Sequence, residues 1–131
     1  MISSPVLDLL IRLKNANKSG KKSILAPFSQ FKQEVCTLLQ KAKYIQSFEV
    51  VKDGNKSDLS IQLAYEDNRE PKISNVNVFS RPGRRIYMRA DGLPWGQTPR
   101  SLVIISTPSG LRSQKQAKRE NLGGEIIAEV F

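Results

Sequence analysis

The sequence predicts an α+β fold made of two small α/β halves. Apolar residues recur at helical spacing in two segments of the first half, whereas apolar and polar residues alternate along shorter segments, as in half-buried strands. The 131 residues are enough for one domain or for two very small ones. Residues 1–78 are expected to form an N-terminal domain, a layer in the order helix, strand, helix, strand, strand, strand. Residues 79–131 are expected to form a C-terminal domain, a mostly antiparallel sheet with one helix.

The first helix is predicted from Pro5 to about Asn15. Ser4 suits the N-cap and Pro5 the first helical position, while Asp8 falls in the first turn, where a carboxylate interacts favourably with the helix dipole. Four apolar residues share one face and are predicted to lie in the core: Val6, Leu9, Leu10 and Leu13.

A short strand and a second helix follow a basic loop at residues 18–22. The strand is predicted over residues 24–26, and apolar residues at helical spacing predict the helix over residues 31–42. Cys36 lies beside the apolar stripe of this helix, where a cysteine behaves as a small buried hydrophobe rather than as a nucleophile.

A β-hairpin is predicted in the middle of the chain. Its strands, residues 45–51 and 59–65, flank the sequence Lys-Asp-Gly-Asn-Lys-Ser, and the second strand alternates apolar and polar side chains. After a polar turn over residues 66–71, residues 73–79 are predicted as a third strand. The first half then ends near Val78.

The second half opens with a turn at residues 80–83 and a strand predicted over residues 84–89. Side chains alternate between its two faces. The outward face carries Arg85, Tyr87 and Arg89, and the inward face carries Ile86 and Met88. Two guanidinium groups around a ring can hold phosphates and pack the ring on a sugar or base. The alternative is a solvated basic strand in which Tyr87 has no ligand.

A buried strand is predicted over residues 101–106, because it is apolar on both faces, and it leads into a tight loop over residues 106–110. The hydroxyl and N–H groups of this loop suit the shallow minor groove of RNA, which displays 2′-hydroxyls and base edges. Ser, Thr, Pro and Gly also form turns whatever the function, so the loop alone decides nothing.

One helix and one strand complete the second half. Ser113 and Gln116 have the spacing of a capping box, which predicts a helix over residues 114–121. Gly123 or Gly124 is expected to end this helix. The last seven residues are predicted as a strand.

The net charge of +9 is unevenly distributed. Residues 1–48 hold eight basic and two acidic side chains, and residues 79–119 hold nine and one. Residues 49–78 hold four basic and six acidic side chains, and residues 120–131 hold three acidic and no basic ones. Two basic lobes separated by an acidic stretch predict a partner made of phosphate, either nucleic acid or an anionic membrane surface.

The residue types exclude several function classes. The chain has no histidine and one cysteine, so imidazole zinc sites, Ser-His-Asp triads and Cys-His dyads are impossible. Glu125 and Glu129 are predicted to share a face of the last strand, but two carboxylates near a chain end do not define a glycosidase. The chain is therefore not expected to be an enzyme, and no metal, cofactor or small-molecule substrate is expected.

The sequence also predicts where the protein is located and whether it binds a membrane or DNA. The longest apolar run is four residues, 102–105, against the roughly 20 that span a bilayer. The N-terminus has Asp8 within its apolar stretch and lacks a basic leader, and a lone cysteine favours a reducing compartment, so a cytoplasmic protein is expected. The basic helix predicted over residues 114–121 has only Ala117 as an apolar residue, which disfavours a membrane surface. No segment has the pattern of a DNA recognition helix.

Four segments occur in a fixed order along the chain. They are Asp8-Leu9-Leu10-Ile11-Arg12-Leu13-Lys14-Asn15-Ala16, Ser80-Arg81-Pro82-Gly83-Arg84-Arg85-Ile86-Tyr87, Ser106-Thr107 with Gly110, and Leu122-Gly123-Gly124-Glu125-Ile126-Ile127. Together they resemble the family of the eighth protein of the bacterial-type small ribosomal subunit, over nearly the whole chain.

The resemblance implies a primary rRNA-binding protein that helps assemble the central domain of the small subunit, in the cytoplasm or in an organelle. It also implies neighbouring ribosomal proteins as partners and, as an alternative function, repression of its own messenger. The implied RNA-binding residues are Ser106, Thr107, Gly110, Tyr87 and Glu125, with Arg81, Arg84, Arg85, Arg89, Arg112 and Gly124 nearby. A second contact is implied for the N-terminal half, at Lys14, Asn15 and Lys18.

The chain departs from the family pattern at two positions. Pro108 stands where a second serine usually follows the threonine, and proline has neither a hydroxyl nor an N–H. Either Ser109 substitutes for that serine or Pro108 rigidifies the loop. Lys43 follows the second helix where a glycine is common, so that helix is expected to end at a strained residue or without a left-handed cap.

Overall fold

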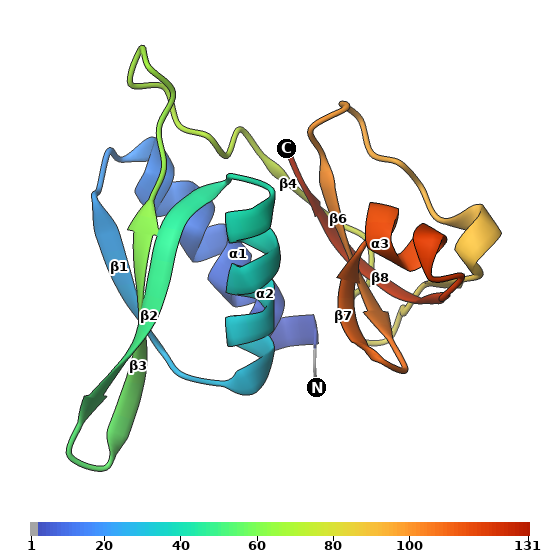
Figure 1. The fold of residues 1–131 in the computed structure, drawn as a ribbon, viewed down its shortest axis with the longest axis horizontal. Coiled ribbons are helices and arrows are strands. Elements are labelled where there is room, and N and C mark those ends of the chain that lie inside the picture. The colour runs from blue at the N-terminus through green and yellow to red at the C-terminus, as the bar shows by residue number, and fades with distance from the viewer. Residues whose placement is uncertain (1–2) are drawn as a thin grey trace.

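Helices and antiparallel sheets make up the computed structural model, which describes residues 3–131 and confirms the predicted α+β class (Figure 1). The helices are α1 (Ser3–Lys18), α2 (Gln30–Lys41) and α3 (Gln114–Arg119), with a single 3-10 turn η1 (Ala90–Gly92) among the described residues. The strands are β1 (Ser23–Pro27), β2 (Ile45–Asp53), β3 (Lys56–Leu63), β4 (Val76–Val78), β5 (Tyr87–Met88), β6 (Leu102–Thr107), β7 (Gly110–Ser113) and β8 (Gly124–Val130).

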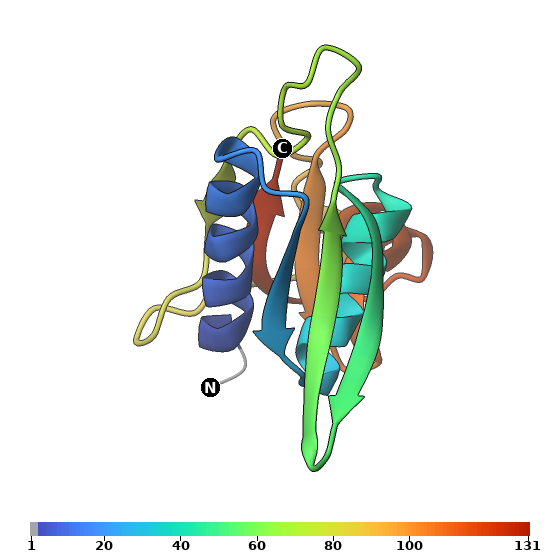
Figure 2. The same ribbon diagram turned by 90° about the vertical axis from the view of Figure 1, so that its left-hand side faces the viewer.

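The first sheet contains β1, β3 and β2 in that order, all antiparallel, and α1 and α2 cover one of its faces (Figures 1 and 2). The predicted strand before α2 and the predicted hairpin are both confirmed. The hairpin strands are longer than predicted, because Asp53 pairs with Lys56 and only Gly54 and Asn55 form the turn. Gly54 has a φ of 63°, as the first residue of a type II′ turn requires.

The second sheet has the order β4-β8-β6-β7, and β5 also pairs with β8. β4 was expected in the layer of the first half, but Val76 pairs with Val130 and Val78 with Ala128 of the last strand. Alternation of side chains identifies a strand without identifying its partner, so the sequence did not show this exchange. The division of the chain near Val78 into two domains stays a prediction.

A bulge in the pairing of β8 with β6 corrects a second expectation. The register shifts between Ile104 and Ile105 of β6, where β8 contributes one extra residue. The extra residue reverses the alternation along β8, so Glu125 and Glu129 lie on opposite faces rather than on the shared face predicted. Glu129 accepts a hydrogen bond from the N–H of Gln97 at 2.6 Å.

The larger hydrophobic core draws residues from both halves. Leu10 of α1, Ile61 of β3, Ile104 of β6 and Ile127 of β8 are all fully buried in it. α1 and α2 therefore lie between the two sheets (Figure 1). α3 covers the opposite face of the second sheet, where Ala117 belongs to a smaller core.

α1 begins two residues earlier and ends three residues later than predicted. Ser4, predicted as the N-cap, lies inside the helix, and the first turn holds no acidic residue because Asp8 comes after it. Pro5 is tolerated in the first turn, where backbone N–H groups have no helical partner, so it did not mark the start of the helix. The predicted core stripe of α1 is buried.

A residue in the left-handed conformation follows each helix: Gly20, Lys43 and Asn121, with φ of 79°, 67° and 56°. After α2, the N–H of Tyr44 donates to the carbonyl oxygen of Leu39 at 2.9 Å, which is the longer bond of a Schellman motif. The strained residue expected at Lys43 is therefore confirmed.

Replacing Lys43 by glycine is expected to raise the free energy of unfolding by about 0.5–1 kcal/mol, because glycine adopts a positive φ without steric cost. Urea unfolding measures the gain. Asn121→Gly is the matched control and should gain less, since asparagine tolerates this conformation. If the Lys43→Gly protein were less stable than the wild type, the left-handed conformation of Lys43 would not be a source of strain.

Candidate nucleic-acid interface

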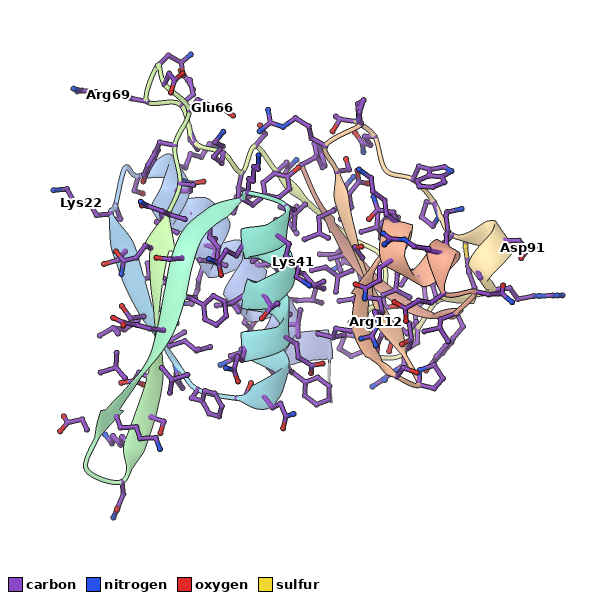
Figure 3. All side chains as sticks on the ribbon, viewed as in Figure 1. Lys22, Lys41, Glu66, Arg69, Asp91 and Arg112 are labelled. Carbon is purple, nitrogen blue, oxygen red and sulfur yellow. The ribbon has the colours of Figure 1, made fainter. Side chains whose placement is uncertain are left out.

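A groove of about 670 Å³ lies where β5, the start of β8 and the β6–β7 turn meet. It is called the Tyr87 groove below. The structure brings five of the predicted site residues together in it: Tyr87, Arg89, Ser106, Gly124 and Glu125. Asp91, which is labelled in Figure 3, also lines the groove.

Two glycines allow the strands around the groove to approach closely. A Cβ at Gly124 would stand 2.1 Å from the carbonyl oxygen of Ser106, and one at Gly123 would stand 2.6 Å from that of Met88. The prediction that one of these glycines ends α3 was wrong, because the left-handed residue after that helix is Asn121. Their role is close packing of backbone on backbone at the base of the Tyr87 groove.

Tyr87 is the most exposed large hydrophobic side chain described, at 65%. β5, which carries it, is only two residues long, whereas the prediction was a strand over residues 84–89. Arg81 and Arg84 form an isolated bridge before it, and Arg89 occupies the N-cap position of η1 after it without a side-chain hydrogen bond to the turn. Met88 was predicted to point into a core, but it is 42% exposed and lines the groove, because β5 is a two-residue strand beside β8 rather than a regular strand over residues 84–89.

Glu125 lies opposite Tyr87 in the β5–β8 pairing and is only 5% exposed. Its Oε1 is 3.7 Å from an Nη1 of Arg85, whereas its Oε2 is buried and has no hydrogen-bond partner among residues 3–131. A buried carboxylate oxygen without a partner is costly, so Glu125 carries an unsatisfied hydrogen-bond acceptor at the wall of the groove.

The hydroxyl loop has a different form from the one predicted. Ser106 and Thr107 end β6, Gly110 starts β7, and only Pro108 and Ser109 make the turn. Thr107 is 8% exposed; its Oγ1 donates to the carbonyl of Gly110 at 2.7 Å and accepts from the N–H of Ser109 at 3.1 Å. This hydroxyl therefore holds the turn, while Pro108 and Ser109 are exposed at its tip.

β7 was missed by the sequence analysis because Gly110–Ser113 contains a single apolar residue, Leu111. The N-cap that follows was predicted correctly, since the Ser113 Oγ accepts from the N–H of Gln116 at 3.2 Å. Arg112 of β7 forms an ion pair with Glu120 at 3.4 Å, so its guanidinium group already has a partner within the protein.

The predicted N-terminal contact residues lie on α1, outside the Tyr87 groove. Lys14 donates to the Asn75 Oδ1 at 3.4 Å and is half-buried. Asn15 and Lys18 are exposed near the end of the helix. The structure does not bring these three residues together with Tyr87.

Cys36 is buried, and burial raises the pKa of its thiol to about 12, so it is not a nucleophile at neutral pH. Across residues 3–131, no three His, Cys, Asp or Glu side chains are grouped so as to hold a metal ion. No helix in this described range combines the length and apolarity needed to cross a membrane.

Comparison with known sequences gives a consistent result. The sequence pattern of the family described as Ribosomal protein S8 matches residues 4–131. The small ribosomal subunit protein uS8 of Kosmotoga olearia is 37% identical over 134 residues, which cover 100% of both chains. The uS8 protein of Persephonella marina is 35% identical to this chain over 100% of both chains. The uS8 protein of Mycoplasmopsis pulmonis is 36% identical over 100% of this chain and 98% of its own. Since these matches extend over the whole length, as the four sequence segments predicted, this chain belongs to the ribosomal protein S8 family.

Proposed function

We propose that this chain binds the central domain of small-subunit ribosomal RNA directly, as a primary rRNA-binding protein that helps the subunit assemble. Membership of the S8 family makes it a structural ribosomal protein rather than an enzyme, with its place in the cytoplasmic ribosome. The proposal adds direct RNA binding, the part of the RNA that is bound and the residues that bind it.

One observation carries the proposal: the exposed ring of Tyr87 stands beside the buried carboxylate of Glu125, whose Oε2 has no partner among residues 3–131. An exposed ring stacks on an unpaired base or packs on a ribose. A carboxylate accepts a hydrogen bond from a ribose 2′-hydroxyl, which DNA lacks. The Tyr87 groove therefore has the chemistry to bind an irregular or splayed RNA segment.

Positive charge on the segment that carries β5 supports the same proposal. Arg81, Arg84 and Arg89 are exposed, and none of the three has a carboxylate within 4.0 Å among the described residues. Exposed arginines position a phosphate backbone, while the ring and the carboxylate distinguish what lies in the groove. Lys14, Asn15 and Lys18 on α1 are proposed as a separate contact from the N-terminal half.

The direct test compares naked small-subunit ribosomal RNA with duplex DNA of equal length. The RNA should bind more tightly, and its affinity should fall steeply between about 50 and 200 mM salt, since each phosphate contact adds about 0.7–0.9 to the log–log slope. Footprinting should show protection within the central domain of the RNA. Equal competition by DNA, or an affinity that hardly changes with salt, would refute the proposal.

The turn at Pro108 offers a second test, because its two hydroxyl residues differ in structural role. Ser109→Ala removes an exposed hydroxyl and should weaken RNA binding roughly 2- to 12-fold, the equivalent of one hydrogen bond, with no change in stability. Thr107→Ala should lower both stability and affinity, because its hydroxyl makes two hydrogen bonds within the turn. Thermal unfolding and RNA titration separate the two effects. Unchanged RNA affinity in Ser109→Ala would rule out Ser109 as the substitute for the missing serine.

A further inference from the structure

A second groove, of about 600 Å³, lies between the two halves of the molecule. The end of α2, the start of α3 and the residues just before β6 form its walls. It is called the inter-half groove below. Arg100 and Leu102 line it at the start of β6, whereas the Tyr87 groove includes Ser106 and Pro108 at the other end of that strand. The six-residue strand spans about 20 Å, so the two grooves are separate sites.

Positive charge dominates the lining of the inter-half groove. Its cationic side chains come from four segments of the chain, and no carboxylate lines the groove. The cations are Lys41, Lys43, Lys72, Arg100, Lys115 and Arg119. Glu66 lies next to the groove and pairs with Lys72 at 3.0 Å and Arg100 at 3.2 Å, which holds these two side chains in place. The other four cations have no carboxylate within 4.0 Å among residues 3–131.

Two features of this groove lining are unfavourable for the isolated fold. Lys43 occupies a left-handed position that glycine would adopt without strain. Lys115 and Arg119 are four residues apart on α3, where like charges repel each other. The repulsion between Lys115 and Arg119 would be relieved by an anionic ligand that neutralises the groove.

We propose that the inter-half groove binds backbone phosphates of an RNA strand, as a contact separate from the Tyr87 groove. The inference rests on the proposed function, since ribosomal RNA is the polyanion that the chain would meet. An acidic protein segment fits less well, because Leu38 and Leu102 at the base are buried and no exposed aromatic residue lines the groove. Protein interfaces depend on such apolar anchors, whereas phosphate contacts need only positioned cations.

The double variant Lys115→Gln/Arg119→Gln tests this contact in the full-length protein. Both side chains are exposed, so the fold should be retained. The probe is naked small-subunit ribosomal RNA, titrated over a range of salt concentrations and footprinted. The log–log salt slope should fall by about 1.4–1.8, for two lost phosphate contacts, and one set of protected nucleotides should become reactive. The nucleotides that depend on Tyr87 should stay protected.

Lys22→Gln/Arg69→Gln is the matched control. It removes two exposed cations from the far side of the first half (Figure 3), and neither lines the inter-half groove. This variant should keep the wild-type slope and footprint. The inference is overturned if the Lys115/Arg119 variant matches this control, which is also the result expected if an acidic protein occupies the groove. Failure of the wild type to prefer ribosomal RNA over duplex DNA would instead refute the proposed function, so the two failures are distinguishable.

Discussion

Replacing Gly124 by alanine is expected to lower the free energy of unfolding by about 3 kcal/mol, at the upper end of the range for overpacked sites. The new Cβ would lie 2.1 Å from the carbonyl oxygen of Ser106 and 3.1 Å from the Cα of Thr107. Both are backbone atoms of a central strand, so no flexible side chain can move aside. Either β8 or the end of β6 must shift, and the unfolding temperature should fall by roughly 10 °C.

Gly92→Ala is the matched control for that experiment. A Cβ at Gly92 would meet nothing within 4 Å, and the residue has no left-handed φ, so its stability should stay within about 0.5 kcal/mol of the wild type. Thermal or urea unfolding of the two variants side by side isolates the effect of the close approach. If the Gly124→Ala and Gly92→Ala proteins were equally stable, β6 and β8 could move apart at residue 124 without lowering the free energy of unfolding.

Replacing Tyr87 by alanine is expected to weaken binding of small-subunit ribosomal RNA by roughly 5- to 150-fold without changing stability. Stacking of one base on an aromatic ring contributes about 1–3 kcal/mol, and a side chain that is 65% exposed contributes little to folding. RNA titration and thermal unfolding measure the two quantities separately. A variant that unfolds normally and binds RNA like the wild type would remove Tyr87 from the interface.

Two companion variants sharpen the Tyr87 experiment. Tyr87→Phe keeps the ring, so it should retain most of the affinity if stacking rather than the hydroxyl is responsible. Trp95→Ala removes another exposed aromatic residue, 59% exposed beneath the ammonium group of Lys118, and it does not line the Tyr87 groove. RNA affinity should be unchanged in this variant.

Local periodicity and the capping box at Ser113 were enough to predict the three helices and most strands, but not how the strands pair. The alternation over residues 73–79 indicated a strand, whereas its pairing with β8 depends on the path of the chain beyond the turn at residues 66–71. β7 was missed because its pairing with β6, rather than its composition, makes it a strand. Pairing partners are decided by contacts between residues distant in sequence, which periodicity does not record.

Part of the predicted site is brought together by the fold, whereas its role in binding stays a prediction. Tyr87, Ser106 and Glu125 do meet in one groove, although their common role in RNA binding stays a proposal. Residue types alone could not predict that the Thr107 hydroxyl would form hydrogen bonds within its own turn, because that depends on Gly110 lying directly opposite. The bulge that separates Glu125 from Glu129 is equally invisible in a one-dimensional pattern.

The core shared by the two halves has a consequence for the thermodynamics of assembly. Leu10 and Ile61 pack in the same cluster as Ile104 and Ile127, and β4 ties the first half to the last strand. The two proposed recognition surfaces at opposite ends of β6 are therefore preorganised, and little conformational entropy of the protein would be lost on filling both. Such a body can impose its own spacing on a flexible polynucleotide, so the ordering cost falls mainly on the RNA.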